Sequence, residues 1–221
     1  MSMTIWDVLV KYYPMFIKGA IGTLKYAAIA VSIGTVLGTL VSLLNLSKIK
    51  VLNVIGAAYV NVIRGTPLLV QMYIFYYFLP MAFPALNEFS AESMVVFSMF
   101  INSSAYVAEI IRGGIKSVDI GQTEAARSLG MTSSHCMTRI ILPQAIKNIL
   151  PALANEYVSM IKETSLAGSF MLYELTYTRT LLASKYLVWQ PLFIIAGIYL
   201  IMTLALSGLV SLLEKRFAVS D

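Results

Sequence analysis

The chain has 221 residues, of which 58% are hydrophobic and 12% are charged. Soluble domains carry about 25% charged residues, so this composition excludes an ordinary soluble protein and indicates a membrane protein. The net charge of +5 comes from basic residues scattered between apolar blocks, a pattern that argues against nucleic-acid binding and fits membrane orientation.

Five apolar stretches are long enough to cross a bilayer, which needs roughly 20 residues in a helix. They lie at about residues 26–47, 51–83, 93–111, 146–168 and 187–213. The first contains Gly34 and Gly38 at the spacing that lets two membrane helices approach closely. The second is interrupted by Arg64 and Pro67, where we expect the helix to break. These spans leave little room for a separate soluble domain, so we expect one all-α, polytopic membrane domain over residues 1–221.

The basic residues predict how the chain sits in the membrane. Five spans place the two termini on opposite sides, and an outside N-terminus leaves ten of the 16 lysines and arginines in cytoplasmic segments. These residues favour the cytoplasmic face. We therefore expect the N-terminus outside and the C-terminus in the cytoplasm.

The polar segment between the third and fourth spans is patterned like short helices on the cytoplasmic face. Thr123 is expected to cap a helix over residues 124–129, and Gly130 to end it in the left-handed conformation. Ala125 and Ala126 give this helix a small-residue surface that lets another protein approach closely. A solvated amphipathic loop helix is the alternative.

The chain shows few residues suited to chemistry. Cys136 is the only cysteine, which excludes an internal disulfide, and His135 is the only histidine. The other candidate ligands do not cluster at metal-binding spacing. No Gly-x-x-x-x-Gly-Lys-Ser/Thr loop is present to hold the phosphates of ATP. We expect no catalytic residue, no metal and no cofactor in this chain.

The polar segment between the third and fourth spans resembles the EAA motif of the membrane subunits of ATP-binding-cassette (ABC) importers. The matching residues are Glu124-Ala125-Ala126, Gly130 and Ile141-Leu142-Pro143. The wider sequence is similar to the polar amino-acid branch, which takes up histidine, glutamate, glutamine, arginine or opines. The similarity covers residues 17–215 and rests on Arg64-Gly65-Thr66-Pro67-Leu68, Gln71, residues 102–109, Arg112-Gly113-Gly114-Ile115, Gly121-Gln122, Pro143-Gln144-Ala145, Pro151, Asn155-Glu156 and Lys162-Glu163-Thr164-Ser165-Leu166.

The resemblance implies a type I ABC importer fold in which residues 117–139 form the coupling segment that docks on an ATPase. The residues implied in coupling are Glu124, Ala125, Ala126, Arg127 and Gly130. The resemblance also implies two ATPase subunits that bind ATP and magnesium, a second permease chain (a copy or a paralogue) and an extracytoplasmic solute-binding protein. The chain would then be a multi-pass translocation subunit in a prokaryotic inner membrane, and not itself an enzyme.

Charged residues inside the predicted spans point to a substrate path, because they usually face a bundle interior or an aqueous cavity. Glu156 is a candidate for binding a cationic group of the substrate, and an ion pair with Arg64 is the alternative. Arg64 is a candidate for holding the substrate's carboxylate, or else an interfacial anchor. Met160 lies one turn beyond Glu156, where it either closes over a ligand or only packs.

Four further side chains are candidates for completing the site, with hydrogen bonds between helices as the alternative for each. They are Gln71, Ser103, Ser104 and Tyr106. Glu109 is expected to pair with Arg112 on the same helix. A secondary transporter driven by an ion gradient is the main alternative function, but we find no internal repeat of the kind common in such folds. A membrane-embedded enzyme would require a nucleophile, base or metal set that the sequence does not display.

Overall fold

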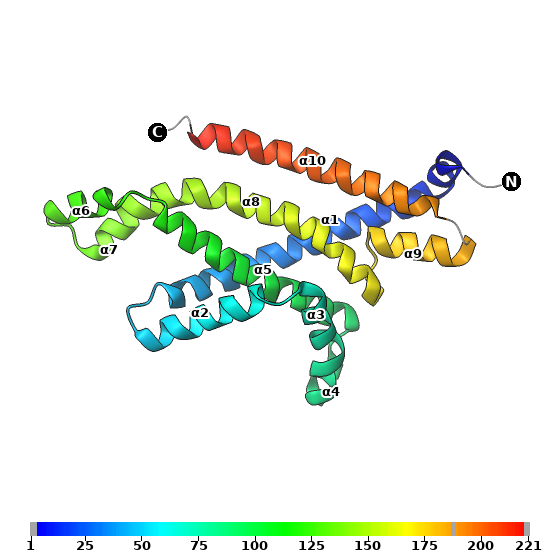
Figure 1. The fold of residues 1–221 in the computed structure, drawn as a ribbon, viewed down its shortest axis with the longest axis horizontal. Coiled ribbons are helices and arrows are strands. Elements are labelled where there is room, and N and C mark those ends of the chain that lie inside the picture. The colour runs from blue at the N-terminus through cyan, green and yellow to red at the C-terminus, as the bar shows by residue number, and fades with distance from the viewer. Residues whose placement is uncertain (1–3, 187–188, 219–221) are drawn as a thin grey trace.

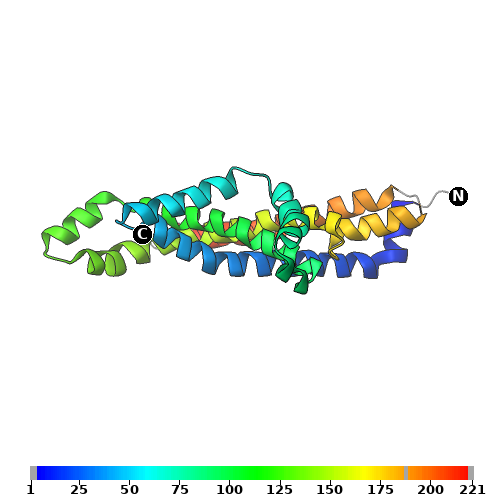
Figure 2. The ribbon, with the colours of Figure 1, turned by 90° about the horizontal axis from the view of Figure 1, so that it is seen from below.

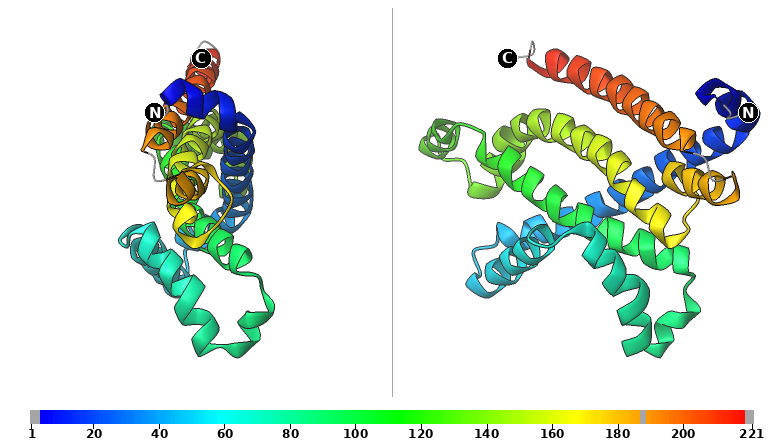
Figure 3. Two further views of the ribbon diagram at one scale, coloured as in Figure 1. Left: turned by 90° about the vertical axis from the view of Figure 1, so that its right-hand side faces the viewer. Right: turned by 45° about the vertical axis from the view of Figure 1, so that its right-hand side comes forward.

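A computed structural model describes residues 4–186 and 189–218, and in these ranges the chain is helical with short connections and no strand. The long helices run roughly along one axis, and the arm that contains α3 and α4 turns away from it (Figures 1 and 3). The elements are α1 (Ile5–Asn45), α2 (Lys50–Arg64), α3 (Leu68–Tyr73), the π-helical turn η1 (Ile74–Phe78), α4 (Leu79–Ala82), the 3-10 turn η2 (Pro84–Glu88), α5 (Ala91–Lys116), α6 (Ile120–Ser128), α7 (Ser133–Cys136), the π-helical turn η3 (Met137–Ile141), α8 (Leu142–Ala167), the 3-10 turn η4 (Gly168–Phe170), α9 (Leu175–Tyr186) and α10 (Gln190–Ala218).

The first helix begins far before the predicted first span at residues 26–47. A capping box between Thr4 and Asp7 starts α1, and the helix kinks at Tyr12. Lysines lie along this early part, and the ammonium of Lys18 sits 4.4 Å from the centre of the Tyr173 ring. The methylene groups of a lysine can cover apolar surface while its ammonium group stays in a polar environment. Hydropathy therefore locates the apolar part of α1 but not its beginning.

The predicted break in the second apolar stretch is present. The axes of Lys50–Arg64 and Leu68–Ala82 meet at a bend of 100°, so residues 51–83 do not form one straight span. Pro67 stands at the N-cap of α3. The buried side-chain amide of Gln71 donates to the carbonyl of Ile63 at 2.7 Å and to the carbonyl of Thr66 at 3.1 Å. These bonds satisfy carbonyls that the end of a helix leaves without a partner.

The glycines of the first span pack where the spacing predicted a close helix contact. α1 and α5 share the most extensive contact between two elements of the described chain. A Cβ built on Gly34 would lie 2.9 Å from the Cβ of Ser103, and one built on Gly38 would lie 2.5 Å from the carbonyl oxygen of Ser104. Only residues without a side chain allow this approach.

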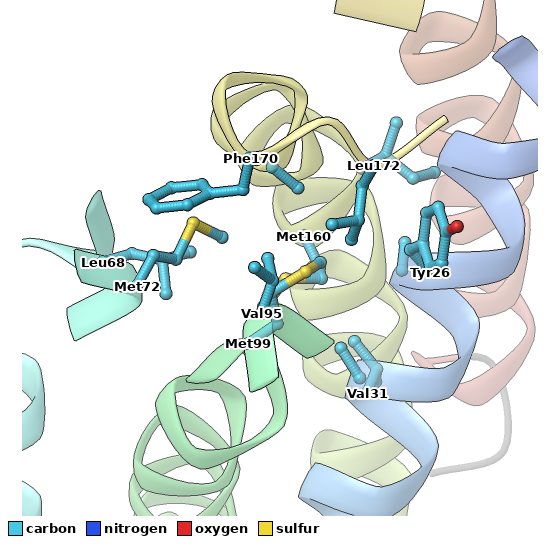
Figure 4. Close-up of a cluster of buried hydrophobic side chains, with 13 residues drawn as sticks. Tyr26, Val31, Leu68, Met72, Val95, Met99, Met160, Phe170 and Leu172 are labelled. Atoms are coloured by element: carbon cyan, nitrogen blue, oxygen red, sulfur yellow. The ribbon is translucent and has the colours of Figure 1, made fainter. Parts of the chain in front are cut away.

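The main apolar core joins α3, the arm after the bend, to the long helices α1, α5 and α8. Figure 4 shows Met72 of α3, Met99 of α5 and Met160 of α8 converging with Tyr26 of α1 and Phe170 of η4. All five side chains are buried. Flexible methionines fill irregular gaps well, which suits a region where helices cross at several angles.

The number of membrane crossings stays a prediction. Within the described residues, α1, α5 and α10 are long and apolar enough to span a membrane, and the bent pair from α2 to α4 would add a fourth span. α8 has 26 residues and four charged side chains, as α5 does. It is not among the helices that are apolar enough to span, and it carries Glu156 near its middle, whereas the charges of α5 lie toward its two ends. The predicted fifth span at 187–213 corresponds to α10, and its first two residues lie outside the described part of the chain.

The sequence did not predict α9, which lies between the predicted fourth and fifth spans. Its first turn is held by the buried carboxylate of Glu174, which accepts hydrogen bonds from the backbone of Thr176 at 2.7 Å and Tyr177 at 2.6 Å. The hydroxyl of Tyr199 on α10 donates to the same carboxylate at 2.7 Å. Glu174 thus caps α9 and ties it to α10.

Candidate functional site

A cavity of about 640 Å³ lies beside the break between α2 and α3, within the size range of small-molecule sites. Residues of the break form one wall, and α5 and α8 form the others. The lining residues are Arg64, Gly65, Thr66, Pro67, Leu68, Leu69, Asn102, Tyr106, Glu156, Ser159, Met160, Glu163 and Leu166. Four of the seven predicted substrate-path residues, Arg64, Tyr106, Glu156 and Met160, therefore line one cavity.

The cavity carries charges of both signs. Arg64, at the C-terminal end of α2, contributes a guanidinium, and Glu156 and Glu163 on α8 contribute carboxyl groups. Ser103 of α5 donates a hydrogen bond to Glu156 at 2.9 Å, which fixes the side chain from behind. A cavity with this lining can hold a solute that carries both an acidic and a basic group.

The predicted alternative of an ion pair between Arg64 and Glu156 is not what the structure shows. Within the described residues, Arg64 pairs with Glu109, at 3.9 Å between Nη1 and Oε1, and not with Glu156. Its guanidinium carbon also lies 5.1 Å from the centre of the Tyr106 ring. The predicted pair of Glu109 and Arg112 is confirmed, with Nε of Arg112 donating at 2.9 Å.

The other three predicted residues lie behind the cavity wall. Gln71 bridges the break between α2 and α3, and its Oε1 accepts a hydrogen bond from Asn102 at 3.1 Å. Ser103 supports Glu156. The hydroxyl of Ser104 lies 2.6 Å from that of Tyr59 on α2 and donates to the carbonyl of Ile101 at 2.7 Å. Their side chains thus hold elements together instead of lining the cavity.

Two lining residues that the sequence interpretation missed follow a helical period. Ser159 and Glu163 lie three and seven residues after Glu156, on the same face of α8. This period is visible in the sequence once Glu156 is chosen. Asn102 was also missed as a lining residue. Its side chain donates a hydrogen bond to Gln71 of α3, a contact between helices that the sequence pattern does not reveal.

The segment between α5 and α8 forms short helices at the end of the molecule opposite to the start of α1 (Figures 1 and 2). The prediction that Thr123 caps the first of them is wrong. α6 begins at Ile120, where the side chain of Asp119 accepts a hydrogen bond from the backbone of Gly121 at 2.7 Å. Asp119 is an equally good capping residue one turn earlier.

The predicted end of this helix is confirmed. Gly130 has a φ of +83°, the left-handed conformation that glycine adopts without strain. Its amide donates to the carbonyl of Arg127 at 3.0 Å, and the amide of Met131 donates to the carbonyl of Ala126 at 3.1 Å. This pair of bonds is the Schellman arrangement that ends many helices.

The surface of α6 differs in part from the expectation. Glu124, Ala125 and Arg127 are exposed, whereas Ala126 is buried with Cys136 and Ile141 in a small core of its own. Ala126 therefore holds the segment together and does not face outward. The guanidinium of Arg127 donates to the carbonyl of Met131 at 2.7 Å and stabilises the turn after the helix.

The fold and the site define a multi-pass membrane subunit of a transporter, with a charged cavity beside a broken helix. The chain belongs to the family described as binding-protein-dependent transport system inner membrane component, whose model matches residues 30–219. The resemblance seen in the sequence is thereby confirmed, and the chain is an ABC importer permease.

Relatives of similar length support this assignment. The chain is similar to the putative glutamine transport system permease protein GlnP of Rickettsia felis, with 37% identity over 221 residues, 97% of this chain and 100% of the relative. It is also similar to the probable glutamine ABC transporter permease protein GlnM of Bacillus subtilis, with 40% identity over 215 residues, 97% of this chain and 98% of the relative.

Solved structures show the same fold. A crystal structure of an amino acid ABC transporter with histidines matches with a TM-score of 0.89 and 46% identity, over 98% of this chain and 100% of that one. An inward-facing form of the MetNI methionine ABC transporter matches with a TM-score of 0.71 at 15% identity, over 95% and 97% of the chains. The predicted all-α fold of a type I ABC importer permease is confirmed by these neighbours.

Proposed function

We propose that this chain is the translocation subunit of an ATP-driven importer that carries polar amino acids into the cell. The names of the relatives, which include glutamine and amino-acid permeases, support this class of substrate. The solved neighbour at 46% identity is an amino acid transporter with histidines. The family membership argues against the alternative of a secondary transporter driven by an ion gradient.

The observation that carries the proposal is the distribution of charge in the 640 Å³ cavity. Every amino acid has a carboxylate and an ammonium group, and the cavity offers Arg64 to the first and Glu156 to the second. A guanidinium fork matches a carboxylate in geometry as well as in charge. Glu163 supplies a further acidic group that would favour a polar or basic side chain.

The partners belong to the same proposal. ATP and magnesium bind to two separate ATPase subunits, and the exposed Glu124, Ala125 and Arg127 of α6 form part of the docking surface. Leu129 is 85% exposed and Ile120 is 70% exposed at the two ends of this helix, which suits burial against a partner. A second permease chain completes the enclosure around the substrate, and an extracytoplasmic binding protein delivers it. This arrangement places the N-terminus outside and the C-terminus in the cytoplasm.

The proposal is tested with the complete transporter in proteoliposomes. The permease, its ATPase and the binding protein are combined, and uptake of labelled glutamine, histidine and arginine is measured with ATP and magnesium inside or outside the vesicles. We expect uptake of at least one of them only when ATP reaches the ATPase side. Uptake without ATPase subunits, driven by an imposed proton or sodium gradient, would contradict the proposal. Native mass spectrometry of the same complex should show two permease chains and two ATPases.

A further inference from the structure

A second cavity, of about 310 Å³, adjoins the first on the side toward the start of α2 and the end of α5. Asn45, Asn53 and Asn61 line it together with Arg112 and Lys116. Lys116 is the last residue of α5, just before the segment that carries α6. In the orientation proposed above, this second cavity lies on the cytoplasmic side of the first.

Arg64 connects the two cavities. Among the described residues, it is the one that lines both of them. Its ion pair with Glu109, which lines the second cavity, spans 3.9 Å. Close charge-assisted hydrogen bonds measure about 2.7–2.9 Å, so Glu109 attracts the guanidinium without engaging it fully. The side chain of Arg64 is 39% exposed, and a carboxylate in the first cavity can therefore reach it.

Glu109 is held firmly from its other side. Both of its carboxylate oxygens accept hydrogen bonds from Arg112, one of them at 2.9 Å from Nε. The oxygen that Arg64 approaches, Oε1, is one of these two. Arg112 thus fixes the Glu109 carboxylate at a constant place beside Arg64, and it compensates much of the charge.

We propose that Glu109 competes with the carboxylate of the substrate for Arg64, and that this competition releases the substrate toward the second cavity. This inference rests on the amino-acid transport proposed above. A substrate carboxylate in the first cavity draws Arg64 away from Glu109. Return of Arg64 to Glu109 weakens the hold on the substrate, and Arg112 and Lys116 attract its carboxylate onward. Glu109 is a positioning residue in this scheme, because it acts on the substrate through Arg64.

The test measures substrate binding to the purified transporter complex in detergent. The probes are L-glutamine, L-histidine and L-arginine, each paired with its carboxamide, which keeps the side chain and the ammonium group but lacks the carboxylate. Glu109→Gln removes the competing charge. We expect the Kd of the amino acid that binds the parent complex to fall about two- to fivefold, the range that a partly exposed ion pair supplies. The Kd of its carboxamide should not change, and maximal transport should slow because release is slower.

Three further variants serve as controls. Glu109→Asp keeps the charge and should leave Kd and transport closer to those of the parent. The double variant with Glu109→Gln and Arg112→Gln restores the net charge of the parent, and the tighter binding should persist in it. Glu88→Gln makes the same chemical change at an exposed position of η2 away from both cavities, and it should alter neither quantity.

The outcomes separate the two proposals. If no amino acid in the panel binds to the parent complex, the proposed function fails and this inference fails with it. If an amino acid binds with the same Kd in the parent and in Glu109→Gln, the competition is refuted while the function stands. An equal fall in Kd for the amino acid and its carboxamide, or loss of the effect in the double variant, would also refute it.

Discussion

Replacement of Gly38 by alanine should loosen the contact between α1 and α5. The new Cβ would lie 2.5 Å from the carbonyl oxygen of Ser104 and 2.8 Å from the Cβ of Val107. A relaxed carbon–oxygen contact measures about 3.3 Å or more. Neither neighbour can rotate away, because one belongs to the backbone and the other is attached to it. α1 must therefore retreat, and overpacking of this kind costs about 1–3 kcal/mol.

A matched variant isolates that cost. Alanine is also a better helix former than glycine by about 1 kcal/mol, which would hide part of the loss. Gly197, on α10, has no atom of another described helix within 4 Å of a built Cβ. Gly197→Ala therefore gains the same propensity without the clash. The difference in stability between the two variants gives the overpacking term alone.

The assay is thermal unfolding of the purified complex in detergent, followed by the loss of its size-exclusion peak. Domains of this size shift by about 2–4 °C per kcal/mol, so Gly38→Ala should melt at least about 2 °C below Gly197→Ala. Equal melting temperatures would show that α1 and α5 do not approach each other this closely, and would refute the reasoning.

Three further predictions concern the coupling segment, the cavity and the cap of α9. Gly130→Asp should abolish transport in an assembled complex, because it adds a side chain and a charge at a left-handed turn against the ATPase; normal uptake would contradict this docking. Glu156→Gln should raise the half-saturation of transport by the equivalent of about 1.5–3 kcal/mol, with little change in the ATPase activity that the binding protein stimulates; unchanged half-saturation with a low yield of complex would instead indicate a structural role. Tyr199→Phe removes a donor to the buried Glu174 and should lower the stability of the complex by about 1–3 kcal/mol, measured as a lower melting temperature, and an unchanged melting temperature would show that this bond is dispensable.

Features that depend on neighbours in the sequence could be predicted. The break at Pro67 follows from the missing amide and the fixed φ of proline, and the end of α6 at Gly130 follows from the left-handed turn that glycine permits. The pairing of Glu109 with Arg112 needs only the helical period. In each case the physical cause lies within a few residues of its effect.

The start of α6 shows where local signals stop being decisive. Thr123 and Asp119 are both good N-cap residues, and the sequence pattern alone gives no reason to prefer either. In the structure Asp119 is the N-cap and the helix begins at Ile120, and Ala126 lies in a small core with Cys136 and Ile141. The start at Ile120 thus goes together with the packing of Ala126 against two residues that come later in the chain. A helix of nine residues is too short for its hydrophobic period to show in the sequence which of its faces is buried.

The charged residues of the candidate site could be predicted from the sequence, because a charge within a membrane domain is costly. A charge inside a membrane domain needs a polar environment, which pointed to Arg64 and Glu156 before their positions were known. The neutral residues carried no such signal. Whether Ser104 faces a cavity or Tyr59 depends on how α2 and α5 pack, and Ser103 could be assigned to Glu156 only after α5 and α8 were placed side by side.

The break beside the cavity requires its own support, and Gln71 provides it. Irregular backbone at membrane depth is tolerated where its polar groups are satisfied or face a water-filled cavity. The Gln71 amide binds the carbonyl of Ile63 in the last turn of α2, and its oxygen is anchored by Asn102 on α5. The same contacts that satisfy the broken helix therefore fix the end of α2 against α5. Because Arg64 directly follows Ile63, they also set its position relative to Glu109 and the cavity, so the support of the fold and the placement of the site depend on one hydrogen-bonded cluster.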